Sequence, residues 1–432
     1  MITINAARCA YCGGCVSTCP VDAIHLAETR LLISEACIEC GLCVPACPMG
    51  ALSEPQSRGP ARAHERIGSR YDLVVVGAGP GGSTAAWQAA ELGLSVLLVE
   101  KRQEIGSPVR CAEGVSHEAL AGFLEPDPAW ISARVDKAQI IALADGQVVE
   151  RWQGHGGLGY VLERRVFDRA LAERAAQAGA QVQVKTAVTS LLHENGTVQG
   201  VVAEWQSQCL EIEAGVVIAA DGVESRVGAW AGLDTQLPLA DTMACAQYLL
   251  AGIDWDPACL GYWIGEEIAP GGYAWVFPKG EGRANVGLGV QADRASETAL
   301  TYLHRFVEQE PALAMGSPVT LIAGNVPVAM PCSQLVAGGL MLVGDAARQV
   351  DPLTGGGIMN AMAAGRLAVQ VAAEALAAGD PSARRLAAYQ EQAGQAIGRR
   401  LARNYRLRER FPPDHRASRD FVRLFAVAAG GK

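Results

Sequence analysis

Apolar and polar positions follow a regular pattern from Tyr71 onward, and this pattern predicts alternating strands and helices. Four consecutive apolar residues at Leu73–Val76 are typical of a fully buried strand. The next predicted elements are a turn at Gly77–Gly82, an Ala-rich helix at Ser83–Leu92 that Gly93 stops, and a second strand at Ser95–Val99. A strand, a helix and a strand in this order predict a βαβ opening with parallel strands.

The rest of the pattern predicts a mixed fold. It indicates a helix near Phe167–Ala178, strands near Gln181–Lys185 and Val216–Ala219, an antiparallel stretch from about Met243 to Val290, a strand at Leu340–Val343, and a helix from Gly357 to about Ala378. Helices are expected to continue to the C-terminus. Residues 53–70 hold almost no large apolar side chain and are rich in Pro, Gly and Ser, which is typical of a linker.

The segment before the linker is dominated by cysteine. Eight of the 13 cysteines lie in two runs of equal spacing: Cys9, Cys12, Cys15 and Cys19 before Pro20, then Cys37, Cys40, Cys43 and Cys47 before Pro48. This is the ferredoxin spacing for two cubane clusters, in which the fourth cysteine of each run binds the other run's cluster. We therefore expect one 4Fe-4S cluster on Cys9, Cys12, Cys15 and Cys47, and a second on Cys37, Cys40, Cys43 and Cys19. Zinc and disulfides are the alternatives, but zinc needs four ligands rather than a run of four closed by Pro, and disulfides need a secreted context.

Length, thiols and charge narrow the class of protein. A chain of 432 residues with 50% hydrophobic residues suggests two or three domains. With no leader before the first cysteine run, no apolar stretch near about 18 residues and many reduced thiols, we expect a cytoplasmic protein. Residues 381–432 carry 12 Lys and Arg against 4 Asp and Glu within a net charge of −9, so the body is acidic, which argues against nucleic-acid binding. The basic segment suits anionic headgroups at the inner membrane face or an acidic partner, and the alternative is a solvated helix.

A dinucleotide fingerprint follows the first predicted strand. Gly77, Gly79 and Gly82 fit Gly-x-Gly-x-x-Gly, with Gly81 inside the string, and Glu100 ends the second strand. Such glycines allow a tight turn and let backbone amides approach a pyrophosphate, while the carboxylate binds ribose hydroxyls. A further Gly344-Asp345 turn places a carboxylate at a strand end, where it can bind a ribityl hydroxyl, and Gly355, Gly356 and Gly357 open a long helix. The bare amides and the helix dipole there can face the pyrimidine edge of a flavin, which favours FAD, and the alternative is a structural Gly-rich turn.

Four separated segments occur in order along the chain: the glycine string at 77–82, Asp221-Gly222, Gly344-Asp345, and Asp351-Pro352 through Gly357. Together they resemble the FAD-dependent proteins of the geranylgeranyl reductase family, within the para-hydroxybenzoate hydroxylase-like flavoproteins. Residues 106–114 look like that family's Cys-x-x-Gly flavin-side loop, and Tyr273-x-Trp275-x-Phe277-Pro278 looks like its substrate motif. The resemblance covers about residues 71–400. Many members lack a fused ferredoxin domain, so the electron donor and the substrate stay open.

The resemblance also implies residue roles. It implies FAD contacts at Gly81, Glu100, Cys111, Ala112, Gly114, Arg164, Asp345, Gly357 and Ile358, with Val188 beside the adenine and Arg165 as the alternative to Arg164. The glycine-rich and Asp-Gly segments add Gly77, Gly79, Gly82, Asp221, Gly344 and Gly356 to the predicted cofactor site.

Two features predict the chemistry next to the flavin. On a strand, Tyr273, Trp275 and Phe277 project to one face as an aromatic wall that suits a hydrocarbon chain, and Pro278 ends that strand; ordinary core packing is the alternative. Tyr262 and Trp263 are expected to extend this surface. Cys111 lies in a polar loop with Arg110 and Glu113, and cationic neighbours that lower a thiol's pKa would make it a catalytic proton donor, the alternative being simple packing against the flavin.

These observations predict a ferredoxin-like domain, a Rossmann-type FAD domain, an antiparallel-sheet substrate domain and C-terminal helices. The expected segments are 1–52 for the two clusters, 53–70 for the linker, 71–240 with 324–380 for FAD, 241–323 for substrate, and 381–432 as a basic helical end. The predicted function is reduction of double bonds in a geranylgeranyl-bearing lipid, diphosphate or prenylated quinone, with FAD fed through the clusters by a low-potential donor such as a ferredoxin, because no second glycine site for NADPH is seen. An electron relay to quinone, similar to electron-transfer-flavoprotein:quinone oxidoreductases, is the main alternative. A flavin monooxygenase is less favoured.

Overall fold

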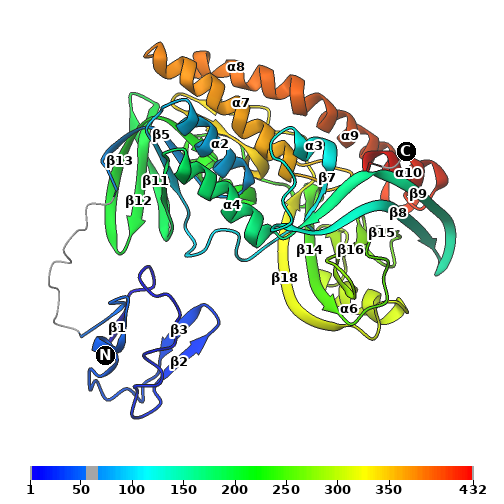
Figure 1. Ribbon diagram of the computed structural model, residues 1–432, viewed down its shortest axis with the longest axis horizontal. Helices are drawn as coiled ribbons and strands as arrows, with labels where there is room; N and C mark the ends of the chain where they lie inside the picture. Colours follow the sequence, from blue (N-terminus) through cyan, green and yellow to red (C-terminus); the bar gives the residue numbers. More distant parts are fainter. Residues whose placement is uncertain (1, 55–66, 431–432) are drawn as a thin grey trace.

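The N-terminal part of the chain is a small domain of short strands (Figure 1). The computed structural model describes residues 2–54 and 67–430. In this domain β1 (Thr3–Ile4) pairs with β4 (Leu52–Ser53), β2 (Ile24–Ala27) pairs with β3 (Arg30–Ile33), and α1 spans Cys43–Ala46. Its core combines cysteines with a few aliphatic residues such as Ile24 and Leu52. Of the predicted linker, residues 55–66 lie outside the described residues, Ser53 belongs to β4 and Arg70 to β5.

A mostly parallel eight-stranded sheet begins at β5. Its strands are β10 (Gln181–Gln183), β6 (Val96–Val99), β5 (Arg70–Val76), β13 (Gln208–Ala219), β12 (Thr197–Trp205) and β11 (Thr186–Glu194) in spatial order, with β20 (Leu340–Leu342) beside β13 and β19 (Val336–Ala337) beside β20. The strands β10, β6, β5, β13 and β20 run parallel. The buried run at Leu73–Val76 and the second strand are thus confirmed, as is the βαβ opening.

Small residues bring two helices of this sheet close together. The helices α2 (Pro80–Glu91), α4 (Arg164–Gln177) and α7 (Ile358–Ala377) pack side by side, with α2 in contact with both others (Figure 1). A Cβ atom added at Gly365 of α7 would lie 2.4 Å from the Gly81 carbonyl oxygen of α2. The close crossing therefore needs glycine there, and it explains why α2 is rich in alanine.

A second eight-stranded sheet lies beside the first. In spatial order its strands are β18 (Ser317–Pro327), β14 (Thr242–Ala251), β17 (Arg283–Gln291), β16 (Tyr273–Pro278), β15 (Cys259–Ile264), β8 (Ile131–Ala144), β9 (Gln147–Leu162) and β7 (Gly114–Ser116). All neighbours are antiparallel except β15 and β8. The predicted FAD segment, 71–240, includes residues 114–162, whereas the strands β7, β8 and β9 of this stretch belong to the second sheet. They join it because β8 pairs in parallel with β15, a strand far away in the sequence.

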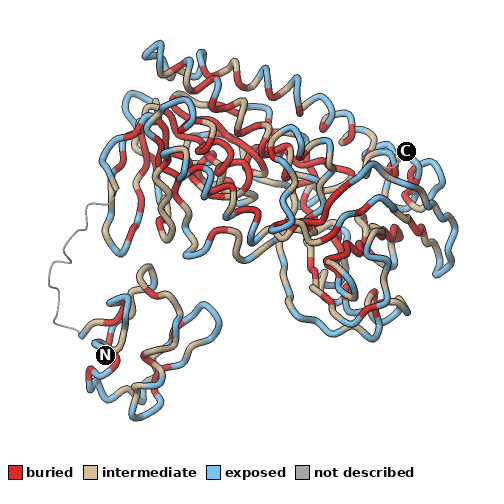
Figure 2. Tube along the Cα trace, viewed as in Figure 1, coloured by how far each residue is buried: buried red, intermediate tan, exposed pale blue. Residues whose placement is uncertain are grey.

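The remaining helices cover the two sheets. α6 (Ala299–Gln309) packs against β14 and β17, α3 spans His117–Ala121 and α5 spans Arg226–Trp230. After α7 come α8 (Ala383–Ala393), a π-helical turn (Gly394–Gly398), α9 (Arg399–Arg410) and α10 (Arg419–Ala428), which reaches β8 and β9. Short 3₁₀ turns occupy Gly222–Glu224, Leu239–Asp241, Gly344–Ala347 and Pro413–His415. Figure 2 shows buried chain concentrated in the first sheet and its helices, while α8 and α9 expose one side. Among the described residues, no helix has both the length and the apolar composition to cross a membrane.

Candidate active site

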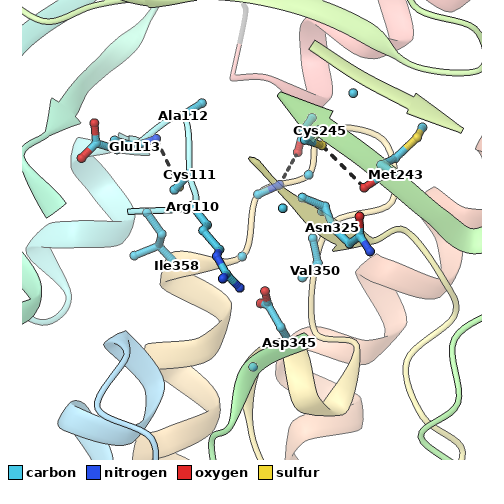
Figure 3. A pocket seen from close by; sticks show the side chains of 18 of the residues that line it. Arg110, Cys111, Ala112, Glu113, Met243, Cys245, Asn325, Asp345, Val350 and Ile358 are labelled. Atoms are coloured by element: carbon cyan, nitrogen blue, oxygen red, sulfur yellow. Dashed lines mark hydrogen bonds between the residues drawn. The ribbon is translucent and has the colours of Figure 1, made fainter. Parts of the chain in front are cut away.

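A cavity of about 320 Å³ lies where the two sheets meet. Its lining comes from the turn after β5, the loop at 110–114, the strands β14, β16 and β18, and the start of α7. Figure 3 shows Arg110 and Asp345 pointing into the same space from two different elements.

Most of the predicted cofactor residues line this cavity. Those that do are Gly79, Gly81, Gly82, Cys111, Ala112, Gly114, Arg164, Gly344, Asp345, Gly356, Gly357 and Ile358. Gly77, Glu100, Val188 and Asp221 are not among the lining residues. The Glu100 carboxylate accepts the amides of Ala78 and Arg102, both at 3.0 Å, and Val188 lies half-buried in β11.

The backbone around the glycine string fits a dinucleotide. Gly77 has φ 102°, and a Cβ there would lie 2.4 Å from the Ala220 carbonyl oxygen, so this turn accepts only glycine without strain. A Cβ at Gly79 would meet nothing within 4 Å, which leaves open space beside the start of α2. Asp221 Oδ1 is buried without a partner among the described residues, and burial raises the pKa of the Asp345 carboxyl. The unpartnered Asp221 oxygen and the partly buried Asp345 carboxyl, beside an open glycine turn, suit the hydroxyls and pyrophosphate of FAD.

The loop before α7 is held by the C-terminal helices. Asp351 Oδ1 accepts the amides of Leu353 and Thr354 at 3.0 and 3.2 Å, which shapes the turn that ends at Gly357. Asp351 Oδ2 accepts Asn404 Nδ2 at 2.7 Å and the Arg400 guanidinium at 3.3 Å, both from α9. The start of α7, where the first amides have no partner within the helix and the dipole end is positive, is therefore held beside the cavity.

Cys111 lies at the junction of the cofactor residues and the second sheet. Its sulfur accepts the Glu113 amide at 3.2 Å (Figure 3) and contacts the Arg164 guanidinium. Burial raises the pKa of the Cys111 thiol, and Arg164 offsets this only in part. The expectation that cationic neighbours lower this pKa is therefore wrong, because desolvation outweighs the nearby charge. A thiol that stays protonated is still the form that a proton donor requires.

Arg164, rather than the alternative Arg165, points into the site. Its Nε and terminal nitrogen donate to the two carboxylate oxygens of Asp168 at 3.1 and 2.7 Å, one helical turn along α4. Arg165 is exposed. The bidentate pair holds the guanidinium in a fixed orientation beside Cys111.

A buried charge cluster anchors the loop that carries Cys111. Glu113 has φ 76° and its carboxylate accepts Lys279 Nζ at 2.7 Å, Asn285 Nδ2 at 2.6 Å and the Arg164 amide at 2.7 Å. The Lys279 and Glu113 side chains are 5% and 4% exposed. Neither Lys279 nor Asn285 belongs to a recognised motif, although Lys279 directly follows the aromatic motif.

The aromatic wall forms as predicted. Tyr273, Trp275 and Phe277 all line the cavity, whereas Pro278 ends β16 outside it. Tyr262 extends the wall, since its ring centre lies 5.5 Å from that of Phe277 and 5.9 Å from that of Tyr273. The expectation that Trp263 does the same is wrong: it packs against Phe306 of α6 on the opposite face, because successive strand residues alternate.

Strand β14 adds side chains that the sequence analysis missed. Met243, Cys245 and Gln247 alternate along it and line the cavity. Cys245 thus shares the cavity with Cys111, and burial raises the pKa of its thiol to about 12. The two-residue spacing of Met243, Cys245 and Gln247 is the sequence signal that could have placed them on one face of a strand.

The eight N-terminal cysteines gather into two groups of four. Cys9, Cys12, Cys15 and Cys47 line one small cavity, and Cys19, Cys37, Cys40 and Cys43 line another. No three metal-binding side chains in the described ranges converge on a single ion position. Each group draws its fourth cysteine from the other run, and the donor sets fit two cubane clusters. The loop of the first run contacts turns of the mostly parallel sheet, where Arg8 donates to the Gln206 carbonyl at 2.9 Å and Lys185 donates to the Cys9 carbonyl.

Three family models match consecutive parts of the chain. A 4Fe-4S dicluster domain matches residues 1–63, an FAD dependent oxidoreductase model residues 72–247, and a geranylgeranyl reductase catalytic domain residues 241–326. FAD and 4Fe-4S clusters are accordingly the cofactors of this chain.

Curated relatives and solved structures agree with these models. A digeranylgeranylglycerophospholipid reductase of Methanothrix thermoacetophila is 52% identical over 79% of this chain and 88% of its own length, and one of Methanosphaerula palustris is 50% identical over 79% and 86%. A geranylgeranyl bacteriochlorophyll reductase-like protein of Thermoplasma acidophilum superposes with a TM-score of 0.75 at 42% identity, over 79% and 87% of the two chains. A flavin-dependent brominase, at 17% identity and a TM-score of 0.64 over 84% and 94%, shares the fold alone. The chain is an oxidoreductase that belongs to the geranylgeranyl reductase family, with a 4Fe-4S dicluster domain at its N-terminus.

Proposed function

We propose that this reductase saturates the double bonds of geranylgeranyl chains on a glycerophospholipid. The observation that carries the proposal is the aromatic wall of Tyr273, Trp275 and Phe277 in the same cavity as Cys111 and the predicted flavin contacts. Such a wall offers a hydrocarbon chain a large apolar contact surface. The names of the relatives in Methanothrix and Methanosphaerula supply the glycerophospholipid as the substrate class.

The predicted site residues have separate roles in this proposal. The glycine string, Glu100, Asp221, Arg164, Asp345 and the start of α7 would hold FAD, and Val188 would lie near its adenine. When bound, FAD supplies the electron pair for the double bond, and the clusters supply electrons to it one at a time. Cys111 would hold a proton at Sγ and give it to the substrate carbon. The buried aromatic rings would exclude water from the reacting carbons and hold the chain in line.

The partners follow from the same arrangement. A low-potential donor such as a ferredoxin would load the clusters on the cysteine-rich domain. A lipid substrate implies a peripheral contact with the membrane surface, for which the exposed arginines of α9, including Arg399, Arg403, Arg406 and Arg410, are the candidates. Arg408 and Arg416 are buried and cannot serve this contact.

The test is a single anaerobic turnover followed by mass spectrometry. Reduced protein given a digeranylgeranyl glycerophospholipid should yield products heavier by about two mass units for each bond reduced, and NADPH alone should leave the flavin oxidised. Rapid reduction of a short-chain quinone with no mass change in the lipid would instead support an electron relay.

A pair of tryptophan variants distinguishes a role of the aromatic wall in substrate binding from a general loss of protein stability. Trp275→Ala should depress lipid reduction because the truncated side chain no longer holds the prenyl chain, while cluster-to-flavin electron transfer persists. Trp263→Ala removes an equal volume from the opposite face of the sheet and serves as the control. Equal losses in both variants would contradict the assignment of the wall.

A further inference from the structure

We propose that Gln247 is a positioning residue that ties the aromatic wall to the loop of Cys111. This inference rests on the proposed function, because it assigns a role in the same site. Gln247 lies in β14, is 4% exposed, and has a side chain on the cavity face of the sheet. Neither the fingerprints nor the aromatic motif includes it.

The Gln247 amide joins two groups of opposite hydrogen-bonding character. Its Oε1 accepts the indole N–H of Trp275 at 2.8 Å, and its Nε2 donates to the Cys111 carbonyl at 3.1 Å. An indole nitrogen can only donate and a carbonyl can only accept, so the amide fits in one orientation. The two hydrogen bonds therefore fix the position of Trp275 relative to Cys111.

The register of the sheet explains how the indole reaches Gln247. Trp275 of β16 pairs with Gly287 of β17, and Gly287 pairs with Gln247 of β14, so the three residues stand in one row on the same face. A Cβ added at Gly287 would lie 2.6 Å from the Trp275 ring. The missing side chain leaves the space that the indole crosses to meet the amide.

Asn285 is a second residue that holds the loop of Cys111, so a change at Gln247 should affect the position of Cys111 and not the whole loop. Asn285 Nδ2 donates to the Ala112 carbonyl at 3.3 Å and to Glu113, so the rest of the loop stays attached when Gln247 is changed. Loss of Gln247 should therefore shift the Cys111 peptide without releasing the loop. A misplacement of about 1 Å at a reacting group can cost on the order of 100-fold in rate.

The first measurement compares turnover of the FAD-loaded enzyme for three variants. Gln247→Leu should lower kcat about 10- to 100-fold with KM changed less than about 3-fold, because binding contacts of the wall persist. Gln153→Leu, which alters an exposed glutamine of β9, should behave as wild type. Trp275→Phe keeps an aromatic ring but removes the indole N–H together with part of the ring. The double variant with Gln247→Leu should therefore lose less than the sum of the two single losses, since both changes break one connection.

The second measurement uses Gln247→Glu as a rescue that depends on pH. A protonated carboxyl can accept from Trp275 and donate to the Cys111 carbonyl, whereas the ionised form cannot donate. The activity of Gln247→Glu should approach that of wild type at low pH and fall as the pH rises through the pKa of the new carboxyl. The wild-type pH profile should not show this decline. The other titratable groups around the cavity are present in both proteins, so the difference profile isolates residue 247; they are Arg110, Cys111, Glu113, Arg164, Cys245, Tyr273 and Asp345.

The third measurement needs no turnover. The rate of Cys111 alkylation by iodoacetamide, followed by peptide mass spectrometry, should rise in Gln247→Leu and stay unchanged in Gln153→Leu. If no lipid is reduced but this difference remains, the proposed function fails and the positioning role stands. Wild-type kcat in Gln247→Leu, or a pH profile of Gln247→Glu that parallels wild type, would overturn the inference.

Discussion

Replacing Lys279 with methionine tests whether the buried charge cluster holds the Cys111 loop. Lys279 and Glu113 are 5% and 4% exposed and lie 2.7 Å apart. Removing one partner of a buried pair leaves the other charge uncompensated, which costs about 3–5 kcal/mol. Glu113 keeps its hydrogen bonds from the Asn285 side chain and the Arg164 backbone N–H. We therefore expect a loss of unfolding free energy in the lower part of this range, about 3 kcal/mol. Lipid reduction should fall as well, because Glu113 is two residues from Cys111.

The assay is urea unfolding of the FAD-loaded protein, followed by flavin fluorescence as the cofactor is released. Lys137→Met is the matched control, because the Lys137–Asp256 pair is about half exposed and its loss should leave the unfolding midpoint unchanged. The double variant Lys279→Met with Glu113→Gln should recover most of the stability, since a neutral amide needs no counter-ion. If Lys279→Met unfolds at the same midpoint as Lys137→Met, the cluster is not what holds the loop.

Three further outcomes are expected. Cys111→Ser should keep FAD but lose most lipid reduction, because a hydroxyl is a far poorer proton donor than a thiol, and unchanged turnover would assign Cys111 to packing. Burial raises the pKa of this thiol, so the donor is protonated at neutral pH and wild-type turnover should decline only above about 8.5, the ordinary thiol value; a decline near pH 7 would contradict this. Anaerobically purified protein should contain about eight iron atoms, and Cys12→Ser should remove a cluster but leave FAD bound, whereas iron near two or four would refute two cubane clusters.

Local sequence signals predicted the elements that depend on near neighbours. The glycine string, the buried run after Tyr71 and the two cysteine runs each combine residue type with fixed spacing, and the structure places them as expected. The helix α2 begins at Pro80, earlier than the predicted Ser83, because proline is favoured in the first turn of a helix. Tyr262 and Trp263 show that a prediction of which side chains share a face must also use the two-residue period of a strand. Only one of two successive residues can belong to the aromatic wall.

Contacts between distant segments could not be predicted in this way. The bonds from Gln247 to Cys111, from Lys279 to Glu113 and from Asn404 to Asp351 each join residues more than 50 positions apart. Their existence depends on which strands become neighbours, and β8 beside β15 shows that this order is set by the whole fold. A single polar residue in an apolar strand, such as Gln247, is the only local trace that such a contact leaves.

The C-terminal segment shows how composition can point to one role while packing supplies another. Its excess of arginine suggested a surface for anionic partners, yet Arg408 is buried and donates to the Val328 carbonyl at 2.7 Å. Asn404 binds Asp351 beneath the start of α7, and Phe425 of α10 lies 5.0 Å from the Tyr273 ring, edge to face. The same helices thus brace the predicted flavin loop and cover the aromatic wall. The exposed arginines of α9 belong to the proposed membrane contact, but the segment also packs against the predicted flavin loop and the aromatic wall. Its removal should therefore disturb the cavity before it affects any binding to lipid surfaces.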